Sequence, residues 1–255
     1  MSTLMEPGIN LTSNSSSICP TLLPSSEKSM YREMIESLMY LSTMTHPDIT
    51  YAISTLSQYL DSPHSTHLEA IKQNFQYLIN TKHLQLIIGS NCLTDTNSTS
   101  RILGFSDADW PSQLHHHLIS GFAFFVGVGT TSWSAKKQLI ITLSSTKSEY
   151  VTLTHATKDI LWIHKLLDKL TFLYNHQLPS QFYCDNQGAI ELSKNSCFHA
   201  QKKHINVHFH VICQTVNCRH ICVNYIPTDD MVTDIFTKPL ARVKFKMFRN
   251  LFNIV

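Results

Sequence analysis

No stretch of this sequence approaches the apolar length that a membrane span requires, and its first residues lack the apolar core of a secretory signal peptide. The cysteines form no Cys-x-x-Cys pair. Their odd number, seven in 255 residues, favours reduced thiols over a disulfide framework. The chain also lacks a strong net charge. Its net charge of +2 neither favours nor excludes a nucleic-acid partner. These absences predict an intracellular protein, cytoplasmic or nuclear, with no membrane partner.

The segment 144–170 has a helical period. From Glu149, steps of three or four residues place apolar side chains on one stripe of a long helix: Leu153, Ala156, Ile160, Ile163 and Leu167. Serines and Thr146 precede the stripe, and these residue types cap helix N-termini. The helix dipole alone explains many first-turn glutamates. Because Glu149 lies on the buried stripe, where an unpaired carboxylate is costly, the pattern predicts a cation or a proton opposite it.

Changes of period divide the rest of the chain. Three helices joined by Pro-containing turns are followed by alternating strands and helices, which predicts an antiparallel meander that continues into an α/β unit. Residues 84–88 are interpreted as a strand closing the helical part. The predicted boundaries are a loop or disordered leader at 1–28, a helical segment at 29–90, a linker at 91–100, an α/β domain at 101–240 and a basic helix at 241–255.

Four acidic residues stand at informative positions. Asp107 and Asp185 each end a strand, Glu149 heads the long helix, and Asp234 lies in a late short helix. Carboxylates that meet in space repel one another unless hard cations neutralise them, and Mg²⁺ prefers such oxygen ligands. Two such ions, about 3.5–4 Å apart, activate a water and stabilise the leaving oxygen of a phosphodiester. Asp109 shares a strand face with Asp107 and remains an alternative ligand.

Several motifs follow one another along the chain: Ser-Asp-Ala-Asp-Trp (106–110), Ser-Gly-Phe-Ala-Phe-Phe-Val-Gly (120–127), Ser-Trp-Ser-Ala-Lys-Lys-Gln (132–138), Leu-Ser-Ser-Thr-Lys-Ser-Glu-Tyr (143–150), Tyr-Cys-Asp-Asn-Gln (183–187), Lys-His-Ile (203–205) and Asp-Ile-Phe-Thr-Lys-Pro-Leu (234–240). In this order and spacing the chain resembles the C-terminal RNase H region of a copia-type LTR retrotransposon Pol polyprotein. The segment 29–90 resembles the region that follows the polymerase in these polyproteins.

The resemblance implies an α/β, RNase H-like fold, a five-stranded mixed sheet flanked by helices. It implies a ribonuclease H that uses two Mg²⁺ ions, or Mn²⁺, to hydrolyse the RNA strand of an RNA–DNA hybrid. The implied catalytic and metal-binding set is Asp107, Glu149, Asp185 and Asp234. The implied partners are the hybrid, recognised through shape, 2′-hydroxyls and phosphates, and an upstream reverse transcriptase domain. No Tyr-x-Asp-Asp turn is present, so polymerase activity is not expected.

The resemblance also places Ser145, Asn186 and Gln187 beside the nucleic acid. Lys136 and Lys137 are candidates for phosphate contacts, although a Lys pair at a strand end is more often a solvated turn. Other positions depart from the family pattern by removing or exchanging charge near the expected substrate: His115–Ile119, Lys147 and Gln201–Lys202. These departures leave a second hypothesis open, a catalytically inactive nucleic-acid-binding or structural remnant. A relative of integrases and transposases is a third and weaker one.

Overall fold

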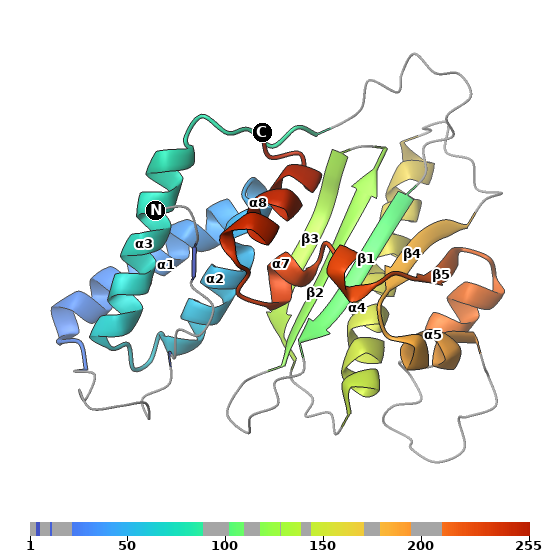
Figure 1. Cartoon of the computed structure of the whole chain (residues 1–255), viewed down its shortest axis with the longest axis horizontal. Helices are drawn as coiled ribbons and strands as arrows, with labels where there is room; N and C mark the ends of the chain where they lie inside the picture. Colours follow the sequence, from blue (N-terminus) through green and yellow to red (C-terminus); the bar gives the residue numbers. More distant parts are fainter. Residues whose placement is uncertain are drawn as a thin grey trace. The chain divides into compact units, whose positions relative to one another are not determined.

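The computed structural model describes residues 4–5, 11, 22–88, 102–109, 118–127, 129–138, 144–170, 179–194 and 211–255 (Figure 1). The chain divides into two compact units, one formed by Met1–Ile87 with Lys238–Val255 and the other by Ile88–Thr237. The first unit is therefore built from two separate stretches of sequence. The predicted linker at 91–100 and most of the predicted leader at 1–28 lie outside the described residues.

The first unit is helical, and its helices are α1 (Ser25–Met44), η1 (Pro47–Ile49), α2 (Thr50–Leu56), η2 (Ser57–Tyr59), α3 (Ser65–Thr81) and α8 (Arg242–Leu251). As the sequence predicts, Pro47 follows the end of α1 and opens the next element. The basic helix α8 joins this unit through its buried Phe245 and Phe248. The strand predicted at 84–88 is wrong. Only an isolated bridge between Leu86 and Ile254 forms, and Asn253 beside it has a left-handed backbone with φ of 58°, which interrupts an extended partner strand.

The second unit contains a five-stranded sheet with the order β3-β2-β1-β4-β5. Its strands are β1 (Ile102–Asp109), β2 (Ile119–Val126), β3 (Gly129–Lys137), β4 (Ser180–Cys184) and β5 (Ile221–Tyr225). The first three strands pair antiparallel, whereas β4 runs parallel to β1 and β5 parallel to β4. This arrangement confirms the predicted meander that continues into an α/β unit. It also confirms the predicted fold class, a mixed five-stranded sheet flanked by helices.

Helix α4 (Ser145–Lys169) packs against β1 and β2 through its apolar stripe. The hydroxyl of Ser144 caps the helix by accepting the Lys147 N–H at 3.3 Å, as the serine-rich start predicts. The predicted stripe is buried from Glu149 to Ile163, and Leu167 is partly buried at its end. The position of α4 on the sheet therefore follows from the period of the sequence.

Two further helical elements lie near the ends of the parallel strands. Helix α5 (Gln187–Lys194) follows β4, and residues 211–217 are helical before β5. After β5, the turn η5 (Thr228–Asp230) leads into the short helix α7 (Asp234–Thr237), which contacts β1, β2 and β3. Alternation along β2 directs Phe122 into the core shared with α4 and Gly121 toward α7, so these two helices cover opposite faces of the sheet. None of the described helices combines the length and apolarity needed to cross a bilayer.

Candidate metal centre

Asp107 lies near the end of β1, and its side chain is only 1% exposed. Its cross-strand neighbour in β2 is Gly121, which leaves room for α7 to approach the sheet. From α7, the hydroxyl of Thr237 donates a hydrogen bond to Oδ2 of Asp107. The carboxylate at the end of β1 is therefore buried and held from the α7 face of the sheet.

Glu149 lies in the first turn of α4 and is 4% exposed. Its Oε1 accepts the backbone N–H of Ala108 at 3.1 Å. This bond joins the start of α4 to the end of β1, one residue from Asp107. The buried position predicted from the stripe is confirmed, and the Ala108 N–H supplies part of the stabilisation that a buried carboxylate requires.

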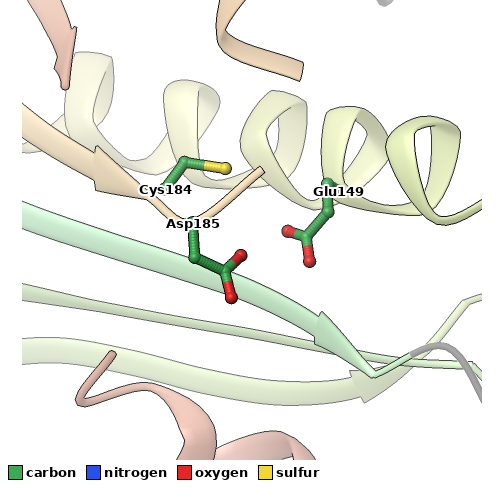
Figure 2. A group of neighbouring side chains, drawn as sticks. All are labelled: Glu149, Cys184 and Asp185. Atoms are coloured by element: carbon green, nitrogen blue, oxygen red, sulfur yellow. The ribbon is translucent and has the colours of Figure 1, made fainter. Parts of the chain in front are cut away.

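Asp185 directly follows β4, and Figure 2 shows its carboxylate pointing toward that of Glu149, with Cys184 beside them. The ligand atoms of Glu149, Cys184 and Asp185 all lie within 4.8 Å of one another. Because β4 runs parallel to β1, the C-terminal ends of the two strands lie at the same edge of the sheet. A hydroxyl from Thr228 donates to Oδ2 of Asp185 at 2.9 Å and orients it.

The thiol of Cys184 responds to the charge of this site. Burial first, and then the negative charge of Glu149, raises the pKa of Cys184 well above its ordinary value, and Asp185 and Asp107 add to the shift. A thiol whose pKa is raised in this way remains protonated at neutral pH and is a poor metal ligand. The donors that remain are carboxylate oxygens, which fit a hard divalent cation such as Mg²⁺.

The structure brings the predicted set together only in part. Among the described residues, the group with metal-ligand spacing is Glu149, Cys184 and Asp185, and both Asp107 and Asp234 lie outside it. Asp234 is 2% exposed at the start of α7, the helix whose Thr237 bonds Asp107. Asp109, the alternative to Asp107, is partly exposed and also lies outside the group.

Residues predicted to lie beside nucleic acid occupy the starts of two helices. Ser145 is exposed at the first position of α4, and Gln187 is exposed at the first position of α5. Asn186 uses its side-chain oxygen to accept the Ala189 N–H at 2.9 Å. A Cβ added at Gly188 would lie 3.1 Å from the side chain of Thr146, so the starts of α4 and α5 are close neighbours.

The remaining predicted positions divide between exposed and undescribed parts of the chain. Lys136 and Lys137 are exposed at the end of β3. Lys147, one of the departures from the family pattern, is partly buried in the first turn of α4. The departures at 115–117 and 201–202 lie outside the described residues.

The sequence did not reveal the role of Gln138, which anchors the start of α4. Its buried side-chain amide donates to Ser120 Oγ at 2.8 Å, to the Ser148 carbonyl at 3.0 Å and to Thr152 Oγ1 at 3.2 Å. These bonds join the end of β3 to β2 and to the helix that bears Glu149. The only sequence signal was its place in the motif 132–138, which does not indicate its partners.

Comparison with known proteins finds relatives that match almost the whole chain. Over 241 residues, 93% of the chain, it is 34% identical to "Retrovirus-related Pol polyprotein from transposon TNT 1-94" of Nicotiana tabacum, and it covers 17% of that protein. Over 226 residues, 88% of the chain, it is 34% identical to the Pol polyprotein from transposon RE2 of Arabidopsis thaliana, and it covers 15% of it. The chain is a homologue of plant copia-type Pol polyproteins. The chain spans less than a fifth of the length of these relatives.

Among solved structures, the chain is similar to LC11-RNase H1 in complex with an RNA/DNA hybrid. The TM-score is 0.38 and the sequence identity 15%, over 51% of this chain and 88% of that chain. No protein-family model matches the chain.

Proposed function

We propose that the chain is an Mg²⁺-dependent ribonuclease H that cleaves the RNA strand of RNA–DNA hybrids at internal positions. The observation that carries the proposal is the meeting of two carboxylates beside Cys184, Glu149 from α4 and Asp185 after β4, with the buried Asp107 on the neighbouring strand β1. The homology to copia-type Pol polyproteins supports the same activity. An upstream reverse transcriptase domain, as in an intact Pol polyprotein, is the proposed covalent partner.

The proposed ligands are oriented by bonds from their own protein. Glu149 is oriented by the Ala108 N–H, Asp185 by Thr228 and Asp107 by Thr237. Ligands fixed in this way lose little conformational freedom when a cation binds. Bound Mg²⁺ would activate a water and stabilise the charge that develops on the phosphate. Asp234, buried on the neighbouring helix α7, is the proposed fourth carboxylate of the set.

Around these ligands, exposed polar and basic groups form the proposed substrate contacts. Ser145 and Gln187 present hydrogen-bonding groups at the starts of α4 and α5. Lys136 and Lys137 add positive charge at the end of β3. Contacts of this kind recognise phosphates and 2′-hydroxyls rather than base sequence, which fits a nuclease that acts on hybrids of any sequence.

The experiment that tests the proposal incubates the purified chain with a labelled RNA–DNA hybrid and Mg²⁺, with Mn²⁺ and EDTA in parallel. We expect internal cleavage of the RNA strand, none in EDTA, and loss of cleavage in Asp107→Asn. Two matched variants serve as controls. Asp109→Asn removes the neighbouring carboxylate on the same strand face, and Asp168→Asn removes an exposed carboxylate near the end of α4.

Each outcome of this assay decides between the functional hypotheses. Hybrid binding without cleavage would support the inactive nucleic-acid-binding remnant, which the departures at Lys147 and elsewhere favour. Loss of cleavage in Asp109→Asn, with full activity in Asp107→Asn, would move the ligand role to Asp109. Wild-type cleavage in both variants would refute the proposed centre.

A further inference from the structure

Thr237 is a completely buried residue at the end of α7, on the opposite face of the sheet from α4. Its hydroxyl donates to Oδ2 of Asp107, and it also lies 3.5 Å from the carbonyl oxygen of Asp234 in its own helix. One side chain thus contacts a proposed ligand and the backbone of another. Neither the metal-ligand pattern nor the motifs assign it any role.

The approach of Thr237 depends on the glycine opposite Asp107. A Cβ at Gly121 would lie 2.7 Å from Thr237 Cγ2 and 2.8 Å from Phe236 Cβ, distances that real Cβ atoms do not adopt. Gly121 is also the cross-strand partner of Asp107. The threonine methyl therefore occupies the space that the missing side chain leaves, while its hydroxyl reaches the adjacent strand.

This packing fixes the direction of the hydroxyl. Threonine carries its methyl and hydroxyl on the same Cβ, so a methyl held over Gly121 restricts χ1 and with it the position of Oγ1. A donor in a fixed position restrains rotation of the Asp107 carboxylate.

We infer that Thr237 is a positioning residue for Asp107, one that orients the carboxylate for cation binding without touching the cation or the substrate. The inference rests on the proposed function, since it concerns the same site. It predicts that the hydroxyl, and not the bulk of the side chain, is what the reaction requires.

The test compares Thr237→Val with Thr237→Ser. Valine keeps the methyl over Gly121 and removes the hydroxyl, whereas serine keeps the hydroxyl and removes the methyl. We expect Thr237→Val to lower kcat about 10- to 100-fold, the range for a lost hydrogen bond to a charged group. KM for the hybrid should change little, the Mg²⁺ concentration for half-maximal activity should rise, and Thr237→Ser should stay within about threefold of wild type.

A second readout does not depend on cleavage. Mg²⁺ that binds the folded chain raises its melting temperature, and the Mg²⁺ concentration needed for this rise should be higher for Thr237→Val than for Thr237→Ser. If the wild type shows the rise but does not cleave, the proposed function fails and the thermal comparison still decides the role of Thr237. If the wild type shows no rise, both proposals are refuted.

A double-mutant cycle tests whether Thr237 acts through Asp107. In an Asp107→Asn background no charged acceptor remains, so adding Thr237→Val should leave the Mg²⁺ requirement for stabilisation unchanged. A further rise of the required Mg²⁺ concentration in the Asp107→Asn background would show that Thr237 acts through another group. Equal defects in the valine and serine single variants would show a packing role and would overturn the inference.

Discussion

Replacing Glu149 by Gln separates the charge of the proposed centre from its shape. The amide is nearly isosteric and keeps an oxygen that accepts the Ala108 N–H, so the contact between α4 and β1 should persist. What disappears is the repulsion between Glu149 and Asp185, whose ligand atoms lie within 4.8 Å. Without a divalent cation, we expect the variant to be more stable than the wild type.

The size of the effect follows from Coulomb's law. Two unit charges separated by 4.8 Å repel by about 3.5 kcal/mol at an effective dielectric constant of 20, and by about 0.9 kcal/mol in bulk water. Asp185 is partly exposed, so its interaction lies between these limits. In Glu149→Gln, the hydrogen bond to the Ala108 N–H is no longer charge-assisted, which lowers the stability of the variant by about 1 kcal/mol. The expected net gain is about 1–2 kcal/mol, or a rise of about 2–8 °C in melting temperature for a domain of this size.

The assay is thermal unfolding followed by tryptophan fluorescence, in EDTA and in Mg²⁺. All three tryptophans of the chain, Trp110, Trp133 and Trp162, fall in the unit Ile88–Thr237, so the signal reports on the unit that contains the site. Added Mg²⁺ should raise the melting temperature of the wild type and should raise that of Glu149→Gln much less. The difference in melting temperature between the two proteins should therefore shrink or change sign. Glu191→Gln, an exposed substitution on α5, should follow the wild type in both solutions.

Two results would refute this reasoning. A Glu149→Gln variant less stable than the wild type in EDTA would mean that the bond to Ala108 outweighs the repulsion. An equal response of both proteins to Mg²⁺ would mean that Glu149 does not bind the cation.

Three other predictions address the rest of the molecule. Burial raises the pKa of Asp48, so the native state holds this proton more tightly than the unfolded chain, and the resulting stability is present at low pH and lost as pH rises through the raised value. Asp48→Asn should therefore flatten the pH dependence of helix melting measured by circular dichroism, and an unchanged profile would contradict the assignment. Gly104→Ala should lower the free energy of unfolding by about 1–3 kcal/mol, because the added Cβ would lie 2.7 Å from the rings of Phe124 and Phe182. Gly188→Ala, whose added Cβ would lie 3.1 Å from its nearest neighbour, should lower it less in the same denaturation assay. Lys136→Ala and Lys137→Ala should each reduce the slope of log hybrid affinity against log salt by about 0.7–0.9, whereas unchanged slopes would identify a solvated turn.

Much of the fold could be predicted because its signals are local. The period of α4, its serine cap and the alternation in β1 depend on residues a few positions apart. The same signals placed Glu149 on a buried face and Asp107 and Asp185 at the ends of strands. The strand at 84–88 was predicted wrongly, since strand pairing depends on a partner at the other end of the chain, and there only Ile254 forms a bridge.

The supports of the proposed ligands could not be predicted. Thr237 forms its hydrogen bond with Asp107 across 130 positions of sequence. The hydrogen bond from Gln138 to Ser120 depends on the pairing of β2 with β3. Gly121 shows no function in the sequence, because its importance is the absence of a Cβ where α7 arrives. The presence of Cys184 among the carboxylates depends likewise on the parallel pairing of β4 with β1.

The helical unit cannot be completed until the ribosome has passed the whole α/β unit. Tyr77 of α3 receives a hydrogen bond from Arg249 of α8, 172 positions later, and Gln85 exchanges backbone hydrogen bonds with Val255. During synthesis, the helices of 25–81 therefore remain without Phe245 and Phe248 while all of 88–237 is being made. A premature stop directly after Thr237 would remove no residue of the α/β unit, and its damage would fall on the part of the protein that was translated first.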